Sequence, residues 1–342
     1  MTADARSENP SPIDVDRLMR EAASVDLSWI APPPTADGWT LAPDALRFVT
    51  AAVRVLRPRH VLEMGSGLST RLLAREAAAL GNGCAISSVD HDPQYNWDTS
   101  RAESAEPASN VAFHLTPLVV REFGGKLCGA YLIQPDKLAT TQPVDLVVVD
   151  GPPVNLGGRE ATLYQAMDFA RPGTVVLLDD SKRPEERAAI RAWQENLGDA
   201  VSVSQLPGFA KGMAMAVIHK PIRTADLWRR RFDLSRAEID RHVPAGEPLI
   251  VAGESWWAQE LNTPRPVFPL TEQDGQYWGE PADDTAAIAE VEKLKRRGAR
   301  FIAFGWPTFW WLTHYRDFVA TLGPRVVDND RLVLFKLGGD HA

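Results

Sequence analysis

One stretch constrains this chain more than any other, because it joins an apolar strand to a sharp turn. His60 to Thr70 has the sequence HVLEMGSGLST: an apolar run stops at an acid, and two glycines follow with one residue between them. Glycines let the backbone turn tightly and approach a ligand closely. The pattern is typical of a strand-to-helix turn that binds a nucleotide, so it predicts both a fold and a ligand site.

Strand and helix patterns alternate along most of the chain. Helical periodicity predicts helices at residues 15–23, 42–58, 68–80, 161–170 and 183–198, and apolar runs predict strands at 60–65, 84–90, 111–119, 144–149 and 174–180. Such alternation is typical of a parallel sheet covered on both faces. The expected fold class is α/β: a Rossmann-like, doubly wound, mostly parallel sheet, closed by strands at 201–207 and 212–220 and followed by a smaller α/β domain.

Composition divides the 342 residues into four parts. Residues 1–41 are predicted to be an N-terminal extension, partly disordered, because 1–15 are polar and Ala31–Trp39 contains three consecutive prolines. The nucleotide-binding domain is expected at 42–220, a charged linker helix at 221–244 and a small α/β accessory domain at 245–342. Within the last part, the patterns predict strands at 249–253, 300–305 and 332–337 and helices at 283–299 and 308–323.

The bulk composition disfavours several classes of protein. A net charge of −8 does not favour a broad nucleic-acid-binding surface, and no apolar run approaches the roughly 20 residues of a membrane-spanning helix. The two cysteines, Cys84 and Cys128, have no metal-ligand spacing, and a disulfide framework is not expected. The polar N-terminus does not resemble a secretory signal. We therefore expect a cytoplasmic protein with no membrane span and no nucleic-acid partner.

Acidic residues stand at the ends of four predicted strands. Glu63, Asp90 and Asp150 end three of them, and the Asp179–Asp180 pair ends a fourth. In sheets of this kind the ligand lies beyond the carboxyl ends of the strands. These carboxylates are therefore expected to gather at one site.

The turn also indicates which ligand the site takes. A dinucleotide fingerprint has a third glycine where this chain has Thr70, and a carboxylate at Glu63 would repel a pyrophosphate. Glu63 suits a ligand with an ammonium group and a sulfonium cation, and S-adenosylmethionine is such a ligand. Asp90, 27 residues after Glu63, is expected to accept both ribose hydroxyls, a feature that nicotinamide enzymes share.

At this point the chain resembles the class I S-adenosylmethionine-dependent methyltransferases. The resemblance is closest to a bacterial type and rests on VLEMGSGLSTRLLA, VDLVVVDGPP and VVLLDDSKRPEE, within residues 60–220. It implies that residues 42–220 form the S-adenosylmethionine-binding methyltransferase domain, with Asp90 at the ribose and Thr116 near the adenine. The cofactor-binding residues that it implies are Glu63, Gly65, Ser66, Gly67, Ser69, Asp90, His91, Pro117, Leu118 and Asp150.

A related group, the metal-dependent catechol-type O-methyltransferases, adds a candidate metal. The resemblance implies Asp150 and Asp180 as ligands of a Mg²⁺ ion, although Ser181 stands where those enzymes have an asparagine and Pro153 where they have a lysine base. The candidate catalytic residues are then Asp150, Asp180 and Lys182, and His91 is another candidate base. Positioning supplies much of the rate of methyl transfer, so the lack of a clear base does not exclude activity.

Residues 245–340 resemble a small α/β domain that is appended to bacterial glycan-biosynthesis proteins. The matching pieces are FPLTEQDGQYWGEPADDTAAIAEVEKLKRRGARFIAFG and WWLTHY. The aromatic residues of the second piece, with His314, either pack in a core or bind a sugar ring. We interpret the domain as a binding or docking unit, and its resemblance favours a saccharide-like or natural-product acceptor.

The expected function is S-adenosylmethionine-dependent O-methylation of a hydroxyl in a small-molecule or glycan acceptor. The main alternative is a non-catalytic, methyltransferase-like binding or docking protein in a glycan or secondary-metabolite pathway. Glu63 and the missing third glycine disfavour a nicotinamide oxidoreductase, and the lack of an N-P-P-Y-type motif disfavours a nucleic-acid methyltransferase. The sequence does not identify the acceptor, the position methylated or the oligomeric state.

Overall fold

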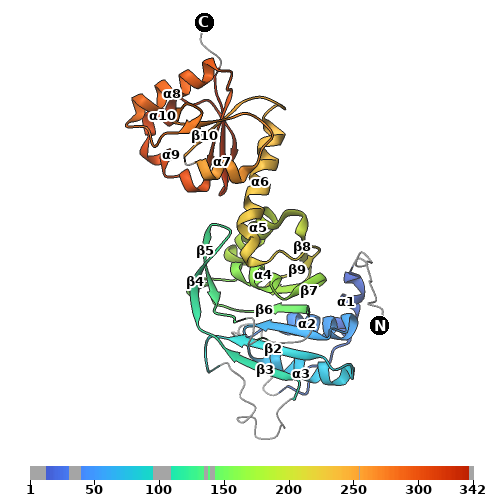
Figure 1. The fold of residues 1–342 in the computed structure, drawn as a ribbon. Helices are drawn as coiled ribbons and strands as arrows, with labels where there is room; N and C mark the ends of the chain where they lie inside the picture. Colours follow the sequence, from blue (N-terminus) through green and yellow to red (C-terminus); the bar gives the residue numbers. More distant parts are fainter. Residues whose placement is uncertain are drawn as a thin grey trace, which may run out of the picture. The chain divides into compact units, whose positions relative to one another are not determined.

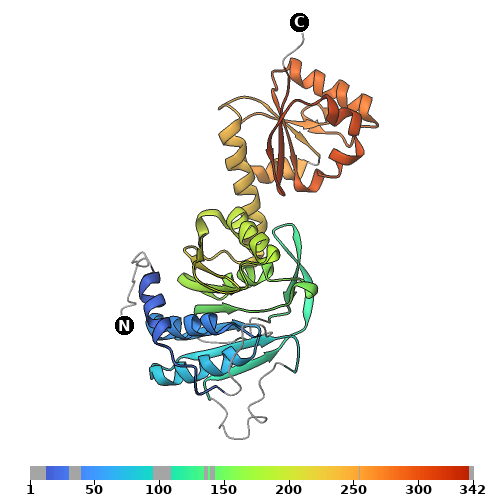
Figure 2. The same cartoon turned by 180° about the vertical axis from the view of Figure 1, so that it is seen from behind.

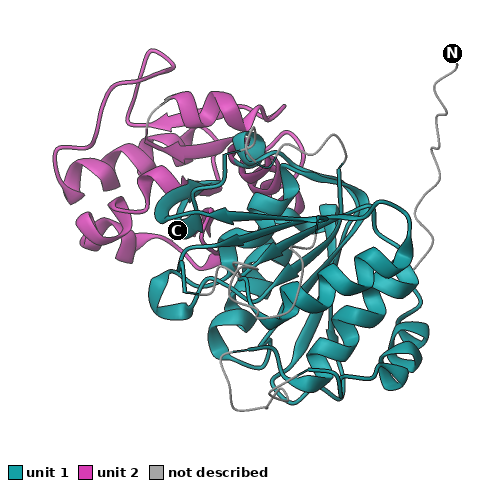
Figure 3. Cartoon of the chain, turned by 90° about the horizontal axis from the view of Figure 1, so that it is seen from below, with its two compact units in different colours: residues 1–227 teal, residues 228–342 magenta. Residues whose placement is uncertain are grey.

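The computed structural model describes residues 13–30, 40–94, 109–134, 138, 143–253 and 255–338. The chain forms two compact units, residues 1–227 and 228–342 (Figure 3). The finer four-part division stays a prediction, and most of the residues for which disorder or a proline loop is predicted, 1–12 and 31–39, lie outside the described ones. None of the described helices has the length and apolar character needed to cross a membrane.

A seven-stranded sheet forms the centre of unit 1 (Figure 1). Its order is β3 (Val111–Leu115), β2 (Ala85–Asp90), β1 (His60–Met64), β6 (Val144–Val149), β7 (Ala170–Asp179), β9 (Met213–Ile218) and β8 (Val201–Leu206). The first five strands run parallel, and β9 is antiparallel to both β7 and β8. This topology confirms the predicted Rossmann-like, mostly parallel sheet.

Helices bury both faces of this sheet (Figures 1 and 2). On one face, α1 (Val15–Ser24), α2 (Pro43–Leu56) and α3 (Leu68–Leu80) pack against Leu146 and Val148 of β6. On the other, α4 (Glu160–Met167) and α5 (Pro184–Leu197) pack against Val147 and Val149. Successive strand residues point to opposite faces, so the unbroken apolar run of β6 is what two covered faces require.

A hairpin that the sequence patterns do not predict follows β3. Residues 118–119, predicted to continue the third strand, instead begin β4 (Leu118–Phe123), which pairs antiparallel with β5 (Lys126–Tyr131). Gly129 of this hairpin lies against a single turn of 3-10 helix, η2 (Val154–Leu156), and its neighbour Gly157. The hairpin therefore reaches the segment that follows β6.

The predicted helix 161–170 is too long at its C-terminal end. Helix α4 stops at Met167, and β7 already begins at Ala170, before the proline and glycine that were expected to end the helix. Within this first part of β7, Arg171 N donates to Thr174 Oγ1 at 3.0 Å, and Thr174 Oγ1 donates to Val144 O at 2.6 Å. The bond from Thr174 to β6 holds the segment in the sheet, and it is a long-range contact that local periodicity does not report.

Unit 2 is a smaller five-stranded α/β layer. Its strand order is β11 (Val267–Leu270), β10 (Leu249–Ala252), β14 (Phe301–Gly305), β16 (Leu332–Lys336) and β15 (Arg325–Asp328), with a short hairpin of β12 (Glu272–Gln273) and β13 (Gln276–Tyr277). β10 is parallel to β11 and β14, whereas β16 is antiparallel to its neighbours. Its helices are α6 (Leu227–His242), α7 (Ser255–Leu261), α8 (Asp284–Arg296), α9 (Trp311–His314) and α10 (Arg316–Thr321).

The single helix predicted at 308–323 is wrong. The helix is interrupted between α9 and α10 at Tyr315, whose backbone lies outside the helical region, with φ −96° and ψ 67°. The Tyr315 hydroxyl donates to Pro281 O at 2.8 Å, and its ring lies 5.3 Å from that of Trp311 and 4.7 Å from that of His314. The interruption thus falls at a residue whose side chain makes a tertiary hydrogen bond, and the aromatic residues pack on each other.

The hairpin contact leads to a stability prediction. A Cβ at Gly129 would lie 2.5 Å from Gly157 Cα and 2.9 Å from Leu156 O, both backbone atoms. We expect Gly129→Ala to lower the free energy of unfolding of unit 1 by about 1–3 kcal/mol, because the η2 segment must move. Urea denaturation measures this change.

The matched control is Val120→Ala, at the position paired with Gly129 and 71% exposed. It should change the unfolding free energy by no more than about 0.5 kcal/mol. Equal stabilities of the two variants would contradict the close packing of hairpin and η2.

Candidate active site

The acids at the strand ends come together at one edge of the unit 1 sheet. Glu63 lies in β1, Asp90 ends β2, Asp150 follows β6, and Asp179 ends β7 immediately before Asp180. These four strands are consecutive neighbours in the order β2, β1, β6, β7. Because they are parallel, their carboxyl ends share one edge, where ligands of such sheets bind.

The turn after β1 packs closely on the turn after β6. Gly65 has φ +103°, and a Cβ there would lie 2.7 Å from Gly151 N and 2.9 Å from the carbonyl carbon of Asp150. The amides of Asp150 and Gly151 both donate to Met64 O, at 2.9 and 2.8 Å. Gly67 differs, because its φ of 164° is extended and no atom lies within 4 Å of its Cβ position. Packing therefore requires a glycine at 65, whereas 67 faces open space.

The backbone amides of this turn are already engaged. Gly65 N donates to a β2 carbonyl at 2.8 Å, and Ser66 N donates to Asp90 Oδ2 at 2.7 Å. Gly67 N donates to Thr70 Oγ1 at 3.0 Å. A phosphate cradle needs unpaired amides that point at the ligand. These three residues have none to offer.

Glu63 lies behind the turn. It is fully buried, and its Oε2 accepts hydrogen bonds from Thr70 Oγ1 at 2.6 Å and Ser88 Oγ at 2.5 Å. Burial raises the pKa of Glu63 to about 7, and the neighbouring hydroxyl groups offset only part of the rise. Its contacts join the first turn of α3 to β2. Direct contact of Glu63 with a ligand, which the resemblance implies, stays a prediction.

Asp90 anchors the other side of the site. Its Oδ2 accepts the Ser66 amide and its Oδ1 accepts the Asp92 amide at 2.8 Å, while His91 Nδ1 lies 3.2 Å from Oδ1. A carboxylate oxygen has two lone pairs. Asp90 can therefore still accept hydrogen bonds from a ligand after it has organised the turn.

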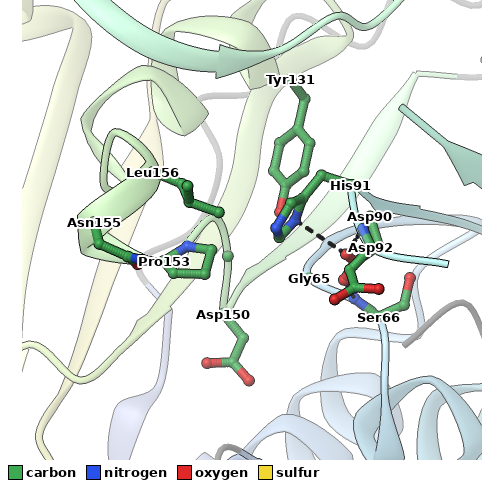
Figure 4. Close-up of a pocket in the computed structure, with 11 residues that line it drawn as sticks. Gly65, Ser66, Asp90, His91, Asp92, Tyr131, Asp150, Pro153, Asn155 and Leu156 are labelled. Atoms are coloured by element: carbon green, nitrogen blue, oxygen red, sulfur yellow. Dashed lines mark hydrogen bonds and ion pairs between the residues drawn. The ribbon is translucent and has the colours of Figure 1, made fainter. Parts of the chain in front are cut away.

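Three cavities adjoin these residues. The first, of about 260 Å³, is lined by Gly65, Ser66, Asp90, His91, Asp92, Tyr131, Asp150, Gly151, Pro153, Asn155 and Leu156 (Figure 4). The second, of about 40 Å³, shares Ser66 and Asp150 with it and is lined also by Thr40, Leu41, Gly67, Leu68 and Ser69. The third, of about 300 Å³, lies beside Thr116 and Pro117. None of the three is lined by Glu63, Leu118, Asp180 or Lys182.

Behind the first cavity, a buried guanidinium holds the strand-end acids together. Arg159, which precedes α4, donates through Nη2 to Asp150 O at 2.6 Å, to Asp150 Oδ1 at 3.1 Å and to Asp180 Oδ2 at 3.0 Å. Its Nη1 donates to Asp179 O at 2.9 Å, and its Nε lies 3.7 Å from Glu186 Oε1. The sequence patterns did not single out Arg159, because its partners come from β6, β7 and α5.

Acids outnumber the cations that touch them in this cluster. The carboxyl groups of Asp150, Asp180 and Glu186 contact two guanidinium groups, those of Arg159 and the half-exposed Arg183. Asp179 adds a fourth carboxyl group, whose oxygens have no hydrogen-bond partner among the described residues. Burial raises the pKa of Asp150 and Glu186, and raises that of Asp179 to about 6. The cluster thus contains more carboxyl groups than guanidinium groups, and Asp150 is the acid of this cluster that lines the first cavity.

The candidate base and metal residues have other partners. Lys182 Nζ donates to Phe209 O at 2.6 Å and Ala210 O at 3.2 Å, and Ser181 Oγ donates to Gln205 Oε1 at 2.7 Å. Asp150, Asp179 and Asp180 do offer oxygen atoms within 4.8 Å of one another, a donor type that suits Mg²⁺. One carboxylate oxygen of Asp150 and one of Asp180 are, however, hydrogen-bonded by Arg159.

Tyr131 is a second residue that the sequence patterns missed. It ends β5, and its fully buried side chain lines the first cavity, where Figure 4 shows it beside His91. Its hydroxyl has no hydrogen-bond partner within the part of the chain that the structure describes. Burial raises the pKa of Tyr131 well above its usual value, so the hydroxyl stays protonated at neutral pH and can donate a hydrogen bond.

The burial of Glu63 leads to a prediction about pH. A carboxyl group whose pKa rises from 4.5 to about 7 on folding stabilises the fold below pH 4.5 and loses that contribution as the pH rises to 7. The change corresponds to about 3 kcal/mol. We expect Glu63→Gln to lack this loss, so urea denaturation at pH 5 and pH 8 should show a smaller drop in stability for the variant.

Glu185→Gln, which removes an exposed acid from the first turn of α5, is the matched control and should follow the wild type. If Glu63→Gln and the wild type lost equal stability between the two pH values, Glu63 would not be a buried acid with a raised pKa.

Comparisons with known proteins agree with this geometry. Residues 62–181 match a family model described as a methyltransferase domain. No curated protein matches the chain. Among solved structures, an O-methyltransferase from Bacillus cereus in complex with SAH is 21% identical, over 60% of this chain and 92% of that one, with a TM-score of 0.39. The O-methyltransferase TomG from Streptomyces achromogenes, in complex with SAM, is 19% identical over 60% and 90%, with a TM-score of 0.38.

Residues 62–181, which match the methyltransferase-domain model, lie within a mostly parallel, Rossmann-like sheet like that of the class I methyltransferases. The predicted enzyme class, a methyltransferase, is thereby confirmed.

Proposed function

We propose that unit 1 binds S-adenosylmethionine and transfers its methyl group to a hydroxyl oxygen of a small-molecule acceptor. The observation that carries this proposal is the state of the turn after β1, whose three amides are engaged and cannot cradle a phosphate. Among the residues that the structure describes, no lysine or arginine lines the first two cavities, and a carboxylate forms part of both. Such a site favours a cationic ligand without phosphate over a dinucleotide.

The two acids of the cavity wall have separate parts in this proposal. Asp150 has one oxygen on Arg159 and faces the second cavity, beside the N-terminus of α3, where an ammonium group would be its partner. Asp90 has free lone pairs for the ribose hydroxyls, and His91 and Asp92 line the same cavity. In this assignment Gly65, Ser66, Gly67 and Ser69 surround the ligand, whereas Glu63 acts through Thr70 and Ser88.

Methyl transfer needs little from the protein beyond position and a route for one proton. An acceptor oxygen attacks the methyl carbon in line, the bond from carbon to sulfur breaks, and the hydroxyl proton leaves. Of the candidate bases, Lys182 donates to two carbonyl groups away from the cavities, whereas His91 lines the first cavity. We therefore favour His91 as the group that takes the proton.

The acceptor side of the cavity is of mixed character, with Tyr131, Pro153, Asn155 and Leu156. A saccharide-like or natural-product acceptor is supported by the resemblance of residues 245–340 to a domain of glycan-biosynthesis proteins. The alternative predicted from sequence, a non-catalytic docking protein, is disfavoured by the match of residues 62–181 to a methyltransferase domain, although Lys182 is engaged elsewhere. Calorimetry with S-adenosylmethionine and with NAD, followed by transfer of labelled methyl groups to candidate acceptors, separates these possibilities.

The charge of Asp150 should matter for cofactor affinity. We expect Asp150→Asn to weaken S-adenosylmethionine binding about 10- to 100-fold, because a charge-assisted hydrogen bond to the ammonium group becomes a neutral one. Calorimetry at pH 7.5 measures the dissociation constant. Glu185→Gln removes the same charge from an exposed position and should leave the affinity unchanged. Equal affinities of Asp150→Asn and the wild type would refute this role of Asp150.

The turn geometry gives a second test of the same site. In Gly65→Ala the added methyl group would meet the backbone of Asp150 and Gly151 at a φ of +103°, so the two turns must separate. We expect loss of measurable S-adenosylmethionine binding, with a sheet that still folds by circular dichroism. Gly67→Ala meets no atom within 4 Å and should keep most of the affinity. A Gly65→Ala variant that bound as tightly as Gly67→Ala would show that the close contact does not shape the site.

A further inference from the structure

Arg159 has no part in the proposed binding of the cofactor or in the proposed transfer of the methyl group. Its guanidinium is almost completely buried, yet it lines none of the three cavities. It reaches the site only through other groups: the carbonyl oxygens of Asp150 and Asp179, and the carboxylates of Asp150 and Asp180. Buried charges are kept in proteins when they are paired, and the pairing of Arg159 with these groups needs an explanation.

Arg159 contacts the same two aspartates that the resemblance implies as metal ligands. Asp150 and Asp180 are the two aspartates that would hold Mg²⁺, and Arg159 Nη2 lies 3.1 Å from one carboxylate and 3.0 Å from the other. A guanidinium does not lose its proton in proteins, so it stays a cation at this point. A divalent ion bound to the same two oxygens would have to displace it or suffer strong repulsion.

We propose that Arg159 takes the place of the divalent cation, so that this methyltransferase site is metal-independent and has an internal cation that positions Asp150. This inference rests on the proposed function for the activity of the site. The exclusion of a metal ion by Arg159 depends only on the cluster of aspartates around it. The Arg159 guanidinium then holds the ends of β6 and β7 together through hydrogen bonds to their carbonyl groups. It also orients the Asp150 carboxylate at the cavity wall.

The cluster would still be able to hold a metal if the arginine were absent. Both carboxylate oxygens of Asp179 and Oδ1 of Asp180 are buried and have no hydrogen-bond partner among the described residues. Asp150, Asp179 and Asp180 each offer one oxygen within 4.8 Å of the others, and carboxylate oxygens are the hard ligands that Mg²⁺ and Mn²⁺ prefer. Removal of the guanidinium should therefore create a metal site, whereas loss of a purely structural arginine should only destabilise the fold.

Binding of Mn²⁺, followed by electron paramagnetic resonance, tests the proposal on the full-length chain without any cofactor or acceptor. We expect the wild type to take up no stoichiometric Mn²⁺ at submillimolar concentration. Arg159→Met should gain one site, and a second substitution, Asp180→Asn, should remove it again. Arg187→Met, at an exposed position of α5, is the control and should bind no more than the wild type.

The outcomes separate cleanly. Stoichiometric Mn²⁺ binding to the wild type that Asp180→Asn abolishes would overturn the proposal, and so would an Arg159→Met variant that folds but gains no site. Should Arg159→Met fail to fold, the wild type decides, together with its affinity for S-adenosylmethionine, which should not change on dialysis against EDTA. A wild type that binds neither S-adenosylmethionine nor Mn²⁺ would contradict the proposed function and leave the competition at Arg159 intact.

Discussion

The contacts of one buried guanidinium connect the parts of unit 1 that form the candidate site. Arg159 precedes α4 and bonds to the ends of β6 and β7, and its Nε faces Glu186 of α5. Removing one partner of a buried ion pair typically costs about 3–5 kcal/mol, because a charge is left without compensation. The loops after the two strands are thus held at a fixed spacing, and this fixes the position of the Asp150 carboxylate at the cavity wall.

The turn after β1 shows how the same residues can form a fold and select a ligand. Its amides donate to β2, to Asp90 and to Thr70, and Thr70 in turn donates to the buried Glu63. Each of these bonds removes a donor that a phosphate would need. In the proposed site, the hydrogen-bonded amides of the turn therefore contribute to ligand specificity as much as the charge of the acids around it.

Sequence reasoning succeeded where the signal is local and periodic. The apolar runs predicted the parallel strands, α3 at Leu68–Leu80 matched the predicted range, and the strand-end acids came to one edge. It failed where tertiary contacts decide: the hairpin β4–β5, the end of α4 and the break at Tyr315. Arg159 and Tyr131 were missed for the same reason, since neither has a neighbour in sequence that reveals its place. Lys182 and Glu63 were noticed, but their hydrogen-bond partners could not be known from sequence.

The central claim is that the cavity between Asp90 and Asp150 holds S-adenosylmethionine without a phosphate subsite. A crystal structure of the wild-type chain grown with S-adenosylhomocysteine tests it most directly. We expect the amino group of the ligand to lie within hydrogen-bonding distance of the Asp150 carboxylate and the ribose hydroxyls to bond to Asp90. The amides of Ser66 and Gly67 should stay bonded to Asp90 and Thr70. A ligand bound outside this cavity, or amides of the turn released to bind it, would refute this mode of binding.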